Sequence, residues 1–336
     1  MKHMLTGFLA CALTSPVFAE PVHVGPHNFV RAETDRYMQV VIDRSALGEI
    51  AYRDEPTDLG NQTVIRMNLD TLYSSGVFDM QAGPVTVTLP TPEDGRYISA
   101  GVLDQDHLEV AVFHEGTNTF TAEDVNTRYA VIIIRTFMNA RDEDDIAYAN
   151  KLQDQIVVSQ EDRGSFEVPE YDAASLDATR MALLRLGALS RGNLGVRMGT
   201  ADEVDKLSHM IVTAVGWGLL PPDEAAYFAG QPEPGMESVP HELTLKDVPA
   251  DAFWSVTMYN ARGFMVENDL GVNAINNING VANDDGSYRL QFGGCKSDTV
   301  NCIPVPEGWN YVLRAYKPGE EILSGEWQPP APTPVR

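Results

Sequence analysis

This 336-residue sequence lacks the short motifs that identify the common catalytic classes. It contains no Gly-x-Ser-x-Gly nucleophile elbow, no His-Glu-x-x-His zinc motif and no Asp-x-Asp-x-Asp-Gly calcium loop. No glycine fingerprint follows a strand and opens a helix, which argues against nucleotide and dinucleotide binding. The sequence therefore predicts no cofactor and no metal, and it does not by itself identify a reaction.

Basic residues are scarce. The 24 Lys and Arg residues stand against 48 Asp and Glu, which gives a formal net charge of −24. Such an acidic surface repels nucleic acid and anionic membranes. We interpret the charge as a means of solubility, with a cationic partner as the alternative. Charged residues make up only 21% and hydrophobic residues 43%, so the chain is globular rather than an acidic disordered protein.

Long apolar runs are also absent, apart from one at the N-terminus. Residues 4–17 are apolar, follow Lys2 and lead into Val17-Phe18-Ala19. This pattern predicts a signal peptide at residues 1–19, cleaved after Ala19, and a periplasmic or secreted protein with no membrane span. The alternative is a lipoprotein that carries its lipid on Cys11.

Only three cysteines occur, and two would remain after cleavage. Cys295 and Cys302 lie close together in the sequence. In an oxidising compartment such a pair is expected to form a disulfide. A metal or redox site is the alternative, but CxxC spacing and a nearby histidine are both missing.

The order of predicted elements is β, then helical, then β again. Residues 20–140 predict a helix and an N-terminal antiparallel β-sandwich, residues 141–235 a helical connecting region, and residues 236–336 a C-terminal jelly-roll-like domain with a Pro-rich tail. The fold class is mainly β with a helical insert. Alternating or apolar runs predict strands at residues 85–89, 96–103, 110–113, 129–135, 252–260, 288–292 and 309–316.

Helices are predicted from four other patterns. An apolar stripe after Asn28 extends to about residue 47, and the acidic residues 142–145 open a second helix. Residues 173–189 are rich in Ala and Leu. A capping-box sequence at Thr200 and Glu203 opens a helix to about Trp217.

Several stretches together resemble a bacterial family built from domains of unknown function 1254 and 1214. The first domain is resembled by residues 28–37 (NFVRAETDRY), 63–73 (TVIRMNLDTLY) and 83–90 (GPVTVTLP). The second is resembled by residues 253–259 (FWSVTMY), 301–304 (NCIP), 308–311 (GWNY) and 320–327 (EEILSGEW). The resemblance implies an N-terminal β-sandwich, a helical piece and a C-terminal jelly-roll-like domain, and it implies no established reaction.

The segment of residues 66–73 is the richest in polar groups within an apparent strand. Asn68 and Asp70 would share one face of such a strand, and Thr71 and Tyr73 the other. Buried polar groups need partners. The segment is therefore expected either to line a polar pocket or to hold a neighbouring loop.

Other candidate residues lie outside this segment. Asp106 and His107 end a predicted strand, where a carboxylate can orient a histidine as general base; with His114 and Asp70, His107 could instead form a metal site. His209 and Trp217 would share one side of a helix and face a pocket. Asn276 belongs to an amide-rich loop that suits either a hydroxylated ligand or tight turns.

We therefore expect an exported protein that binds a small polar or hydroxylated ligand. The predicted ligand-binding residues are Asn68, Asp70, Thr71, Tyr73, His107, His209, Trp217 and Asn276. One alternative is a hydrolase that uses Asp70 or Asp106 with His107 as catalytic groups. Another is a non-catalytic protein that interacts with the cell envelope. The sequence leaves a homo-oligomer open.

Overall fold

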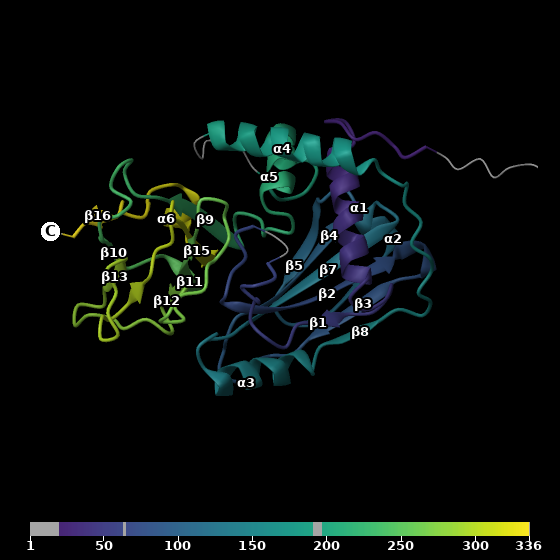
Figure 1. Cartoon of the computed structure of the whole chain (residues 1–336). Coiled ribbons are helices and arrows are strands. Elements are labelled where there is room, and N and C mark those ends of the chain that lie inside the picture. The colour runs from purple at the N-terminus through teal and green to yellow at the C-terminus, as the bar shows by residue number, and fades with distance from the viewer. Residues whose placement is uncertain (1–19, 63–64, 191–196, 336) are drawn as a thin grey trace, which may run out of the picture.

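The computed structural model describes residues 20–62, 65–190 and 197–335. It is mainly β, with two sandwiches and a group of helices, as the sequence predicts (Figure 1). The predicted signal peptide, residues 1–19, lies outside the described residues. Within the part of the chain that is described, no helix is long and apolar enough to cross a membrane.

The N-terminal sandwich consists of a five-stranded and a three-stranded sheet. The five-stranded sheet has the order β1-β2-β7-β4-β5, and the three-stranded sheet the order β6-β3-β8. Their apolar inner faces form one core. The strands are β1 (Ala51–Tyr52), β2 (Thr71–Asp79), β3 (Val85–Leu89), β4 (Ile98–Asp104), β5 (Glu109–Phe113), β6 (Gly116–Phe120), β7 (Tyr129–Phe137) and β8 (Val157–Ser159).

Strand β7 is the central strand of the larger sheet and is buried along its whole length. Its side chains alternate between two cores. Ala130, Ile132 and Ile134 face the three-stranded sheet, whereas Val131 and Ile133 face the helices. Arg135 follows on the helical side, two residues after Ile133. A guanidinium is thereby placed on the covered face of a central strand.

Helices cover the outer face of the five-stranded sheet. Helix α1 (Phe29–Ile42) packs on β2, and α4 (Ala173–Leu189) and α5 (Lys206–Val215) pack beside it, as the upper part of Figure 1 shows. Helix α3 (Glu143–Gln153) lies at the opposite end of the sheet and contacts β7. Shorter helical turns are η1 (Met80–Ala82), α2 (Ala122–Val125) and α6 (Glu320–Leu323).

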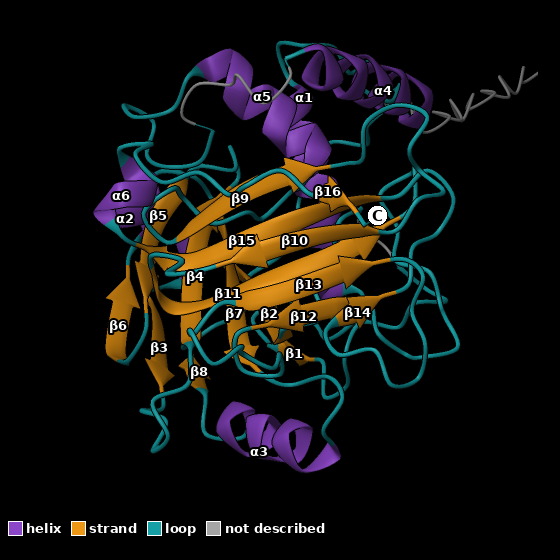
Figure 2. Cartoon of the chain, turned by 90° about the vertical axis from the view of Figure 1, so that its left-hand side faces the viewer, coloured by secondary structure: helices purple, strands orange, loops and turns teal. Residues whose placement is uncertain are grey.

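The C-terminal sandwich has two four-stranded sheets. Their orders are β12-β11-β15-β9 and β14-β13-β10-β16 (Figure 2). The first sheet faces the N-terminal half with its outer side, and its inner side shares a core with the second. The strands are β9 (Ala225–Gly230), β10 (His241–Leu245), β11 (Ala250–Tyr259), β12 (Ala274–Asn276), β13 (Tyr288–Phe292), β14 (Cys302–Ile303), β15 (Asn310–Pro318) and β16 (Thr333–Pro334).

Strand β15 repeats the arrangement of β7. Tyr311 and Leu313 point into the core of the C-terminal sandwich. Arg314 and Tyr316 lie on the other face, which meets the N-terminal half through an aromatic cluster that includes Phe137. The two sheets thus each direct one arginine of an inner strand toward the space between the sandwiches.

The region expected to be a helical connector, residues 141–235, contributes to both sandwiches. It contains α3, α4 and α5, but β8 pairs with β3 of the N-terminal sandwich. Strand β9 pairs with β15 of the C-terminal sandwich. Hydrogen bonding to sheet edges is not encoded by local periodicity, which explains why composition alone did not separate these strands from the helices.

Local predictions differ in accuracy along the chain. Strands β3 and β13 and helix α4 have the predicted boundaries. The predicted helix start at Thr200 is wrong, because α5 begins at Lys206 after the N-cap Asp205. The Thr200 N–H and hydroxyl both donate to the Glu203 carboxylate, which is one half of a capping box, but the pair closes a turn instead of opening a helix. A capping pair is thus compatible with an isolated turn.

The predicted disulfide between Cys295 and Cys302 is confirmed, with a Cα–Cα distance of 5.6 Å. It joins residues on either side of the loop that precedes β14. Cys302 is itself buried and is the first residue of β14, which pairs with β13.

Removal of the disulfide is expected to lower stability. For a loop with a sequence separation of 7, restriction of the unfolded chain corresponds to about 2.5 kcal/mol. The double variant Cys295→Ser and Cys302→Ser should therefore melt roughly 5 °C lower in a thermal denaturation scan. A reducing agent should lower the melting temperature of the wild type by a similar amount and leave the variant unchanged. Equal melting temperatures for both proteins would show that the bridge does not stabilise the fold.

Candidate functional site

The segment of residues 66–73 is a strand only from Thr71 onward, so the predicted alternation of Asn68 and Asp70 with Thr71 and Tyr73 is wrong for its first half. Asn68 lies in the preceding loop. Its amide donates to the hydroxyl oxygen of Tyr316 at 2.9 Å, and its carbonyl oxygen accepts from the Thr71 hydroxyl at 3.2 Å and the Asp70 N–H at 3.3 Å. Asn68 therefore holds the start of β2 against the C-terminal sandwich. The Thr71 hydroxyl is occupied by its bond to Asn68.

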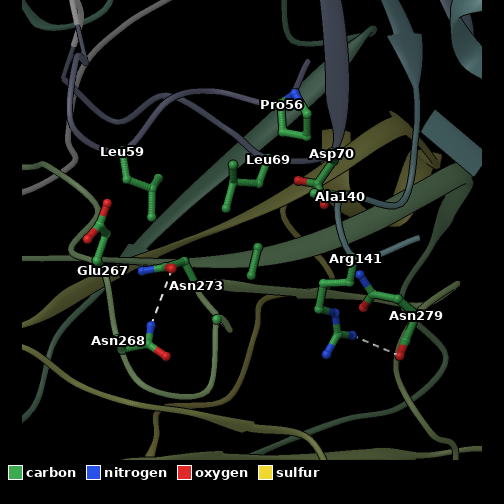
Figure 3. Close-up of a pocket in the computed structure, with 12 residues that line it drawn as sticks. Pro56, Leu59, Leu69, Asp70, Ala140, Arg141, Glu267, Asn268, Asn273 and Asn279 are labelled. Atoms are coloured by element: carbon green, nitrogen blue, oxygen red, sulfur yellow. Dashed lines mark hydrogen bonds between the residues drawn. The ribbon is translucent and has the colours of Figure 1, made fainter. Parts of the chain in front are cut away.

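Asp70 points away from Asn68 and reaches a different part of the molecule. One carboxylate oxygen accepts from the side chain of Asn276 at 3.0 Å. The other has no hydrogen-bond partner among the described residues. Burial raises the pKa of Asp70 above its ordinary value, and the bond from Asn276 and the charge of Arg314 offset only part of this effect. Asp70 lies in the wall of a cavity of about 290 Å³ (Figure 3).

The amides around this cavity are occupied by the loop that carries them. Asn268 donates to the carbonyl oxygens of Val272 and of the Asn273 side chain, and Asn273 in turn donates to the Val266 carbonyl oxygen. Figure 3 shows the bond between Asn268 and Asn273 along the lower left of the cavity. These bonds are those of tight turns, one of the two roles predicted for the amide-rich loop. They leave few side-chain amide groups to bind a hydroxylated ligand.

His107 is fully buried and both of its ring nitrogens have partners. The Gly218 N–H donates to Nε2 at 2.8 Å, so the proton lies on Nδ1, which donates to the Thr213 hydroxyl at 2.9 Å. Burial, with a smaller contribution from His209, lowers the pKa of His107 well below its ordinary value. The imidazole is therefore neutral and holds the end of α5 in place.

Neither candidate carboxylate is the partner of His107. The Asp106 carboxylate binds the Arg31 guanidinium through two bonds of 2.9 and 2.7 Å. Asp70 binds Asn276 instead. His209, also a predicted ligand-binding residue, bonds through its ring to the carbonyl oxygens of Arg197 and Asp106. The proposed Asp–His catalytic pair is therefore not assembled in this structure.

A second cavity, of about 430 Å³, lies between the two sandwiches, and we call it the inter-sandwich cavity. Three predicted ligand-binding residues, Asn68, Tyr73 and Trp217, meet in its wall. None of its described lining residues is Asp or Glu. The full lining is Arg36, Tyr37, Val40, Val41, Arg44, Arg53, Ile65, Arg66, Met67, Asn68, Tyr73, Ser75, Ile133, Arg135, Gly216, Trp217, Gly218, Leu219, Tyr227, Arg314 and Tyr316.

The most deeply placed charges of this cavity are Arg135 and Arg314, which are only 6% and 4% exposed. Arg135 donates from Nη2 to the Gly218 carbonyl oxygen at 2.5 Å. Arg314 donates to the hydroxyl oxygens of Thr257 and Tyr259 and to the Arg66 carbonyl oxygen. Within the described ranges neither guanidinium forms an ion pair with a carboxylate. A buried charge without a counter-ion is costly, which marks both arginines as functional candidates.

Aromatic rings form one wall of the inter-sandwich cavity. Tyr37 stacks on Trp217 with ring centroids 4.6 Å apart, and Trp217 stacks on His107 at 5.6 Å. The guanidinium of Arg36 covers the Tyr37 ring at 4.0 Å. The faces of the Tyr37 and Trp217 rings are thus occupied by neighbouring groups.

Tyrosine hydroxyls add further donors. Tyr316 and Tyr227 each accept one hydrogen bond, from Asn68 and from the Leu220 N–H, respectively. Their O–H groups are then free to donate. The described polar groups of the cavity are therefore mostly donors, which suits a ligand that accepts hydrogen bonds.

Arg135 and Arg314 were missed from the sequence, although a local signal exists for both. Each stands inside an otherwise apolar strand, in the runs VIIIRTF and YVLRAY. A charged residue at a strand position whose neighbours on both sides are buried must find a partner or serve a ligand. The strand containing Arg135 was predicted, but Arg135 was not among the predicted site residues.

Among the described residues, no group of three or more His, Cys, Asp or Glu side chains could hold a metal ion. His114 in particular bonds to the Ile98 carbonyl oxygen and to Glu224, both at 2.8 Å. His114 and His107 have separate partners, so the residues weighed for a metal site are not brought together around one point.

Substitution of Asp70 tests whether its carboxyl is held in the protonated form. Because the pKa is raised in the folded protein, stability is present below the unfolded pKa and is lost as pH rises through the folded pKa. At pH 8, Asp70→Asn should therefore have a higher free energy of unfolding than the wild type, by roughly 1–3 kcal/mol, and a higher melting temperature. The difference should shrink toward pH 4.

The matched control is Asp285→Asn. The hydrogen bonds from Ser287, together with Lys246, lower the pKa of Asp285 to about 2, so this change should slightly lower stability at pH 8. Thermal melts between pH 4 and pH 8 decide the matter. Suppose that Asp70→Asn melts at a lower temperature than the wild type at pH 8 and at the same temperature at pH 4. Asp70 would then be an ionised group that stabilises the fold.

Each half of the chain matches a known protein family model. The domain described as protein of unknown function DUF1254 matches residues 47–122, and that described as DUF1214 matches residues 228–320. No curated protein matches the chain. The VPA0106 protein from Vibrio parahaemolyticus has a similar structure, with a TM-score of 0.69 and 18% identity over 92% of this chain and 98% of that one.

A second similar structure is that of an uncharacterised protein from Burkholderia cenocepacia. Its TM-score is 0.54, with 13% identity over 92% of this chain and 87% of that one. At these identities the likeness extends to the fold alone. The chain belongs to the two-domain family that combines DUF1254 in its N-terminal part with DUF1214 in its C-terminal part.

Proposed function

We propose that this is an exported protein that binds a small organic anion in the inter-sandwich cavity. The single observation that carries the proposal is the pair Arg135 and Arg314. Both guanidiniums are more than nine-tenths buried, both line the cavity, and neither has a carboxylate partner among the described residues. A bound anion would supply the missing counter-charge.

The physical argument starts from the cost of a buried charge. Removing a guanidinium from water costs several kcal/mol unless a counter-ion and hydrogen bonds compensate it. Arg135 uses few of its five N–H donors on the protein, since among the described residues it bonds to the Gly218 carbonyl oxygen alone. Arginine forms two parallel bonds with a carboxylate or phosphate, which makes such groups the natural occupants.

The rest of the lining favours an organic ligand over an inorganic ion. Val40, Val41, Ile133 and Leu219 place aliphatic surface next to the arginines. The volume of about 430 Å³ falls within the usual range for small-molecule sites. An apolar body attached to an anionic head would therefore use both parts of the wall. This narrows the small polar ligand expected from the sequence to an anionic one.

Binding is better supported than hydrolysis. The described lining contains guanidinium, phenol, amide and indole groups, and no carboxylate or imidazole that could act as a general base. The residues proposed for an Asp–His pair have other partners. Export is proposed from the apolar N-terminal run and agrees with the presence of a disulfide.

Octanoate is a suitable first probe because it joins an anionic head to an apolar chain. Octanoate should bind the purified protein and raise its melting temperature by mass action. Octanamide, which has the same shape but no charge, should bind at least about tenfold more weakly, because charge-assisted bonds contribute roughly 1.5–3 kcal/mol. Isothermal titration calorimetry measures both. Equal affinity for the two compounds would contradict an anion site.

Arg135→Gln separates a binding role from a structural one. This change should weaken octanoate binding by roughly 10- to 100-fold, while the melting temperature stays equal or rises, because an uncompensated buried charge is removed. The matched control is Arg289→Gln, which removes the same charge from an exposed ion pair with Glu242 in the C-terminal sandwich. If Arg135→Gln binds octanoate as the wild type does, the arginine does not contact the ligand.

A further inference from the structure

The arginines of the inter-sandwich cavity are arranged in two separate pairs with Arg135 between them. The order follows from the sheet register. Tyr73 on β2 lies directly opposite Arg135 on β7. On the other side of β2, the Arg53 N–H donates to the Tyr73 carbonyl oxygen at 2.9 Å, one residue beyond the last pair of β1 and β2. Arg53, just after β1, therefore lies beside Tyr73 on β2, and Tyr73 lies beside Arg135 on β7.

Arg53 has a second arginine next to it. Arg44 comes from the turn after α1 and lines the same cavity. Burial, together with the charge of Arg53, lowers the pKa of Arg44. This pair stands at the edge of the N-terminal sheet, because β1 is the outermost strand.

The other pair stands at the C-terminal sandwich. Arg314 on β15 donates to the Arg66 carbonyl oxygen at 2.7 Å, so the two residues are neighbours. Burial and the charge of Arg314 lower the pKa of Arg66, although Tyr259 opposes this. Tyr227, which pairs with Arg314 across β9 and β15, also lines the cavity.

The remaining arginine of the lining differs from these five. Arg36 has a carboxylate partner, since its guanidinium binds Glu33 through bonds of 3.0 and 3.1 Å. Among the described residues, Arg44, Arg53, Arg66, Arg135 and Arg314 form no ion pair. A ligand with one anionic head, bound at the deep arginines as proposed above, leaves the like charges of the pair at the sheet edge uncompensated.

We infer that the ligand is a two-headed organic anion, with a carboxylate or similar group at each end and an apolar middle. One head would lie among Arg66, Arg135 and Arg314, and the other between Arg44 and Arg53. Val41 and Ile133 line the space that the middle of the ligand would cross, and Ile133 lies two residues before Arg135 on the same face of β7. This inference rests on the proposed function and specifies the class of its ligand.

A series of acids tests the inference on the full chain. Linear dicarboxylates of four, six, eight and ten carbons are compared with the monocarboxylates of the same lengths by isothermal titration calorimetry. The best dicarboxylate should bind at least tenfold tighter than its matched monocarboxylate, and affinity should peak at one length. Equal affinity of each matched pair would overturn the inference, while the anion site itself would stand. If neither series binds, the proposed function fails.

A double variant locates the second head. Arg44→Gln with Arg53→Gln should bring dicarboxylate affinity down to that of the monocarboxylate, with monocarboxylate affinity changed by less than about twofold. Both residues are at least partly exposed, so the melting temperature should stay close to that of the wild type and report a folded protein. A dicarboxylate preference that survives in this variant would place the second head elsewhere and overturn the assignment.

Discussion

The central constraint on this molecule is that two inner strands, β7 and β15, each bury both faces while carrying an arginine. Strand alternation leaves no choice about where these side chains go. Val131 and Ile133 must face the helices, so Arg135 must as well. Tyr311 and Leu313 must face the C-terminal core, so Arg314 faces the N-terminal half. The cavity between the sandwiches is the space in which both guanidiniums remain accessible.

The surroundings are consistent with that constraint. Asn68 bonds to Tyr316 and so connects the start of β2 to β15. His107, held neutral by burial, accepts from the Gly218 N–H and thereby positions the Gly218 carbonyl group that Arg135 contacts. His107 therefore acts on the cavity through the backbone of Gly218 and through its stacking on Trp217. Residues 66–73, the segment richest in polar groups, contact the arginines: the Arg66 carbonyl oxygen accepts from Arg314, and Tyr73 lies opposite Arg135.

Charge is distributed unevenly in the protein. The chain as a whole carries a formal charge of −24, yet six arginines line one cavity without a single acidic neighbour in its described wall. The long-range field of the protein repels anions, whereas the local field of the cavity attracts them. Under the proposed function, affinity for an anion would come from short-range contacts, which salt screens little. Such a site favours ligands whose apolar part adds to the binding.

The sequence was sufficient for the local and compositional features. Strands β3 and β13, helix α4 and the disulfide followed from alternation, from Ala and Leu content and from cysteine spacing. The two-domain resemblance was carried by long motifs and is confirmed. Of the predicted ligand-binding residues, Asn68, Tyr73 and Trp217 line the inter-sandwich cavity, whereas the others do not: Asp70, Thr71, His107, His209 and Asn276.

Arg314 and His107 show why the sequence did not predict these side-chain contacts. The role of an isolated arginine such as Arg314 depends on whether a carboxylate lies nearby in space. The residues around it come from the loop before β2, from β9 and from β11, far away in the chain. Pairing of His107 with Asp106 looked plausible from adjacency. Its ring instead satisfies the end of α5, since α5 covers the loop that carries it. Tertiary contacts of this kind are not encoded by spacing alone.

The most direct test of the account is to locate a bound anion. Crystals of the protein grown with 8-bromooctanoate would reveal the bromine by its anomalous scattering and the carboxylate by its electron density. We expect the carboxylate within hydrogen-bond distance of Arg135 or Arg314 and the bromine in the same cavity. A carboxylate bound elsewhere, with Arg135 and Arg314 contacting only solvent, would contradict the assignment of the inter-sandwich cavity as the ligand site.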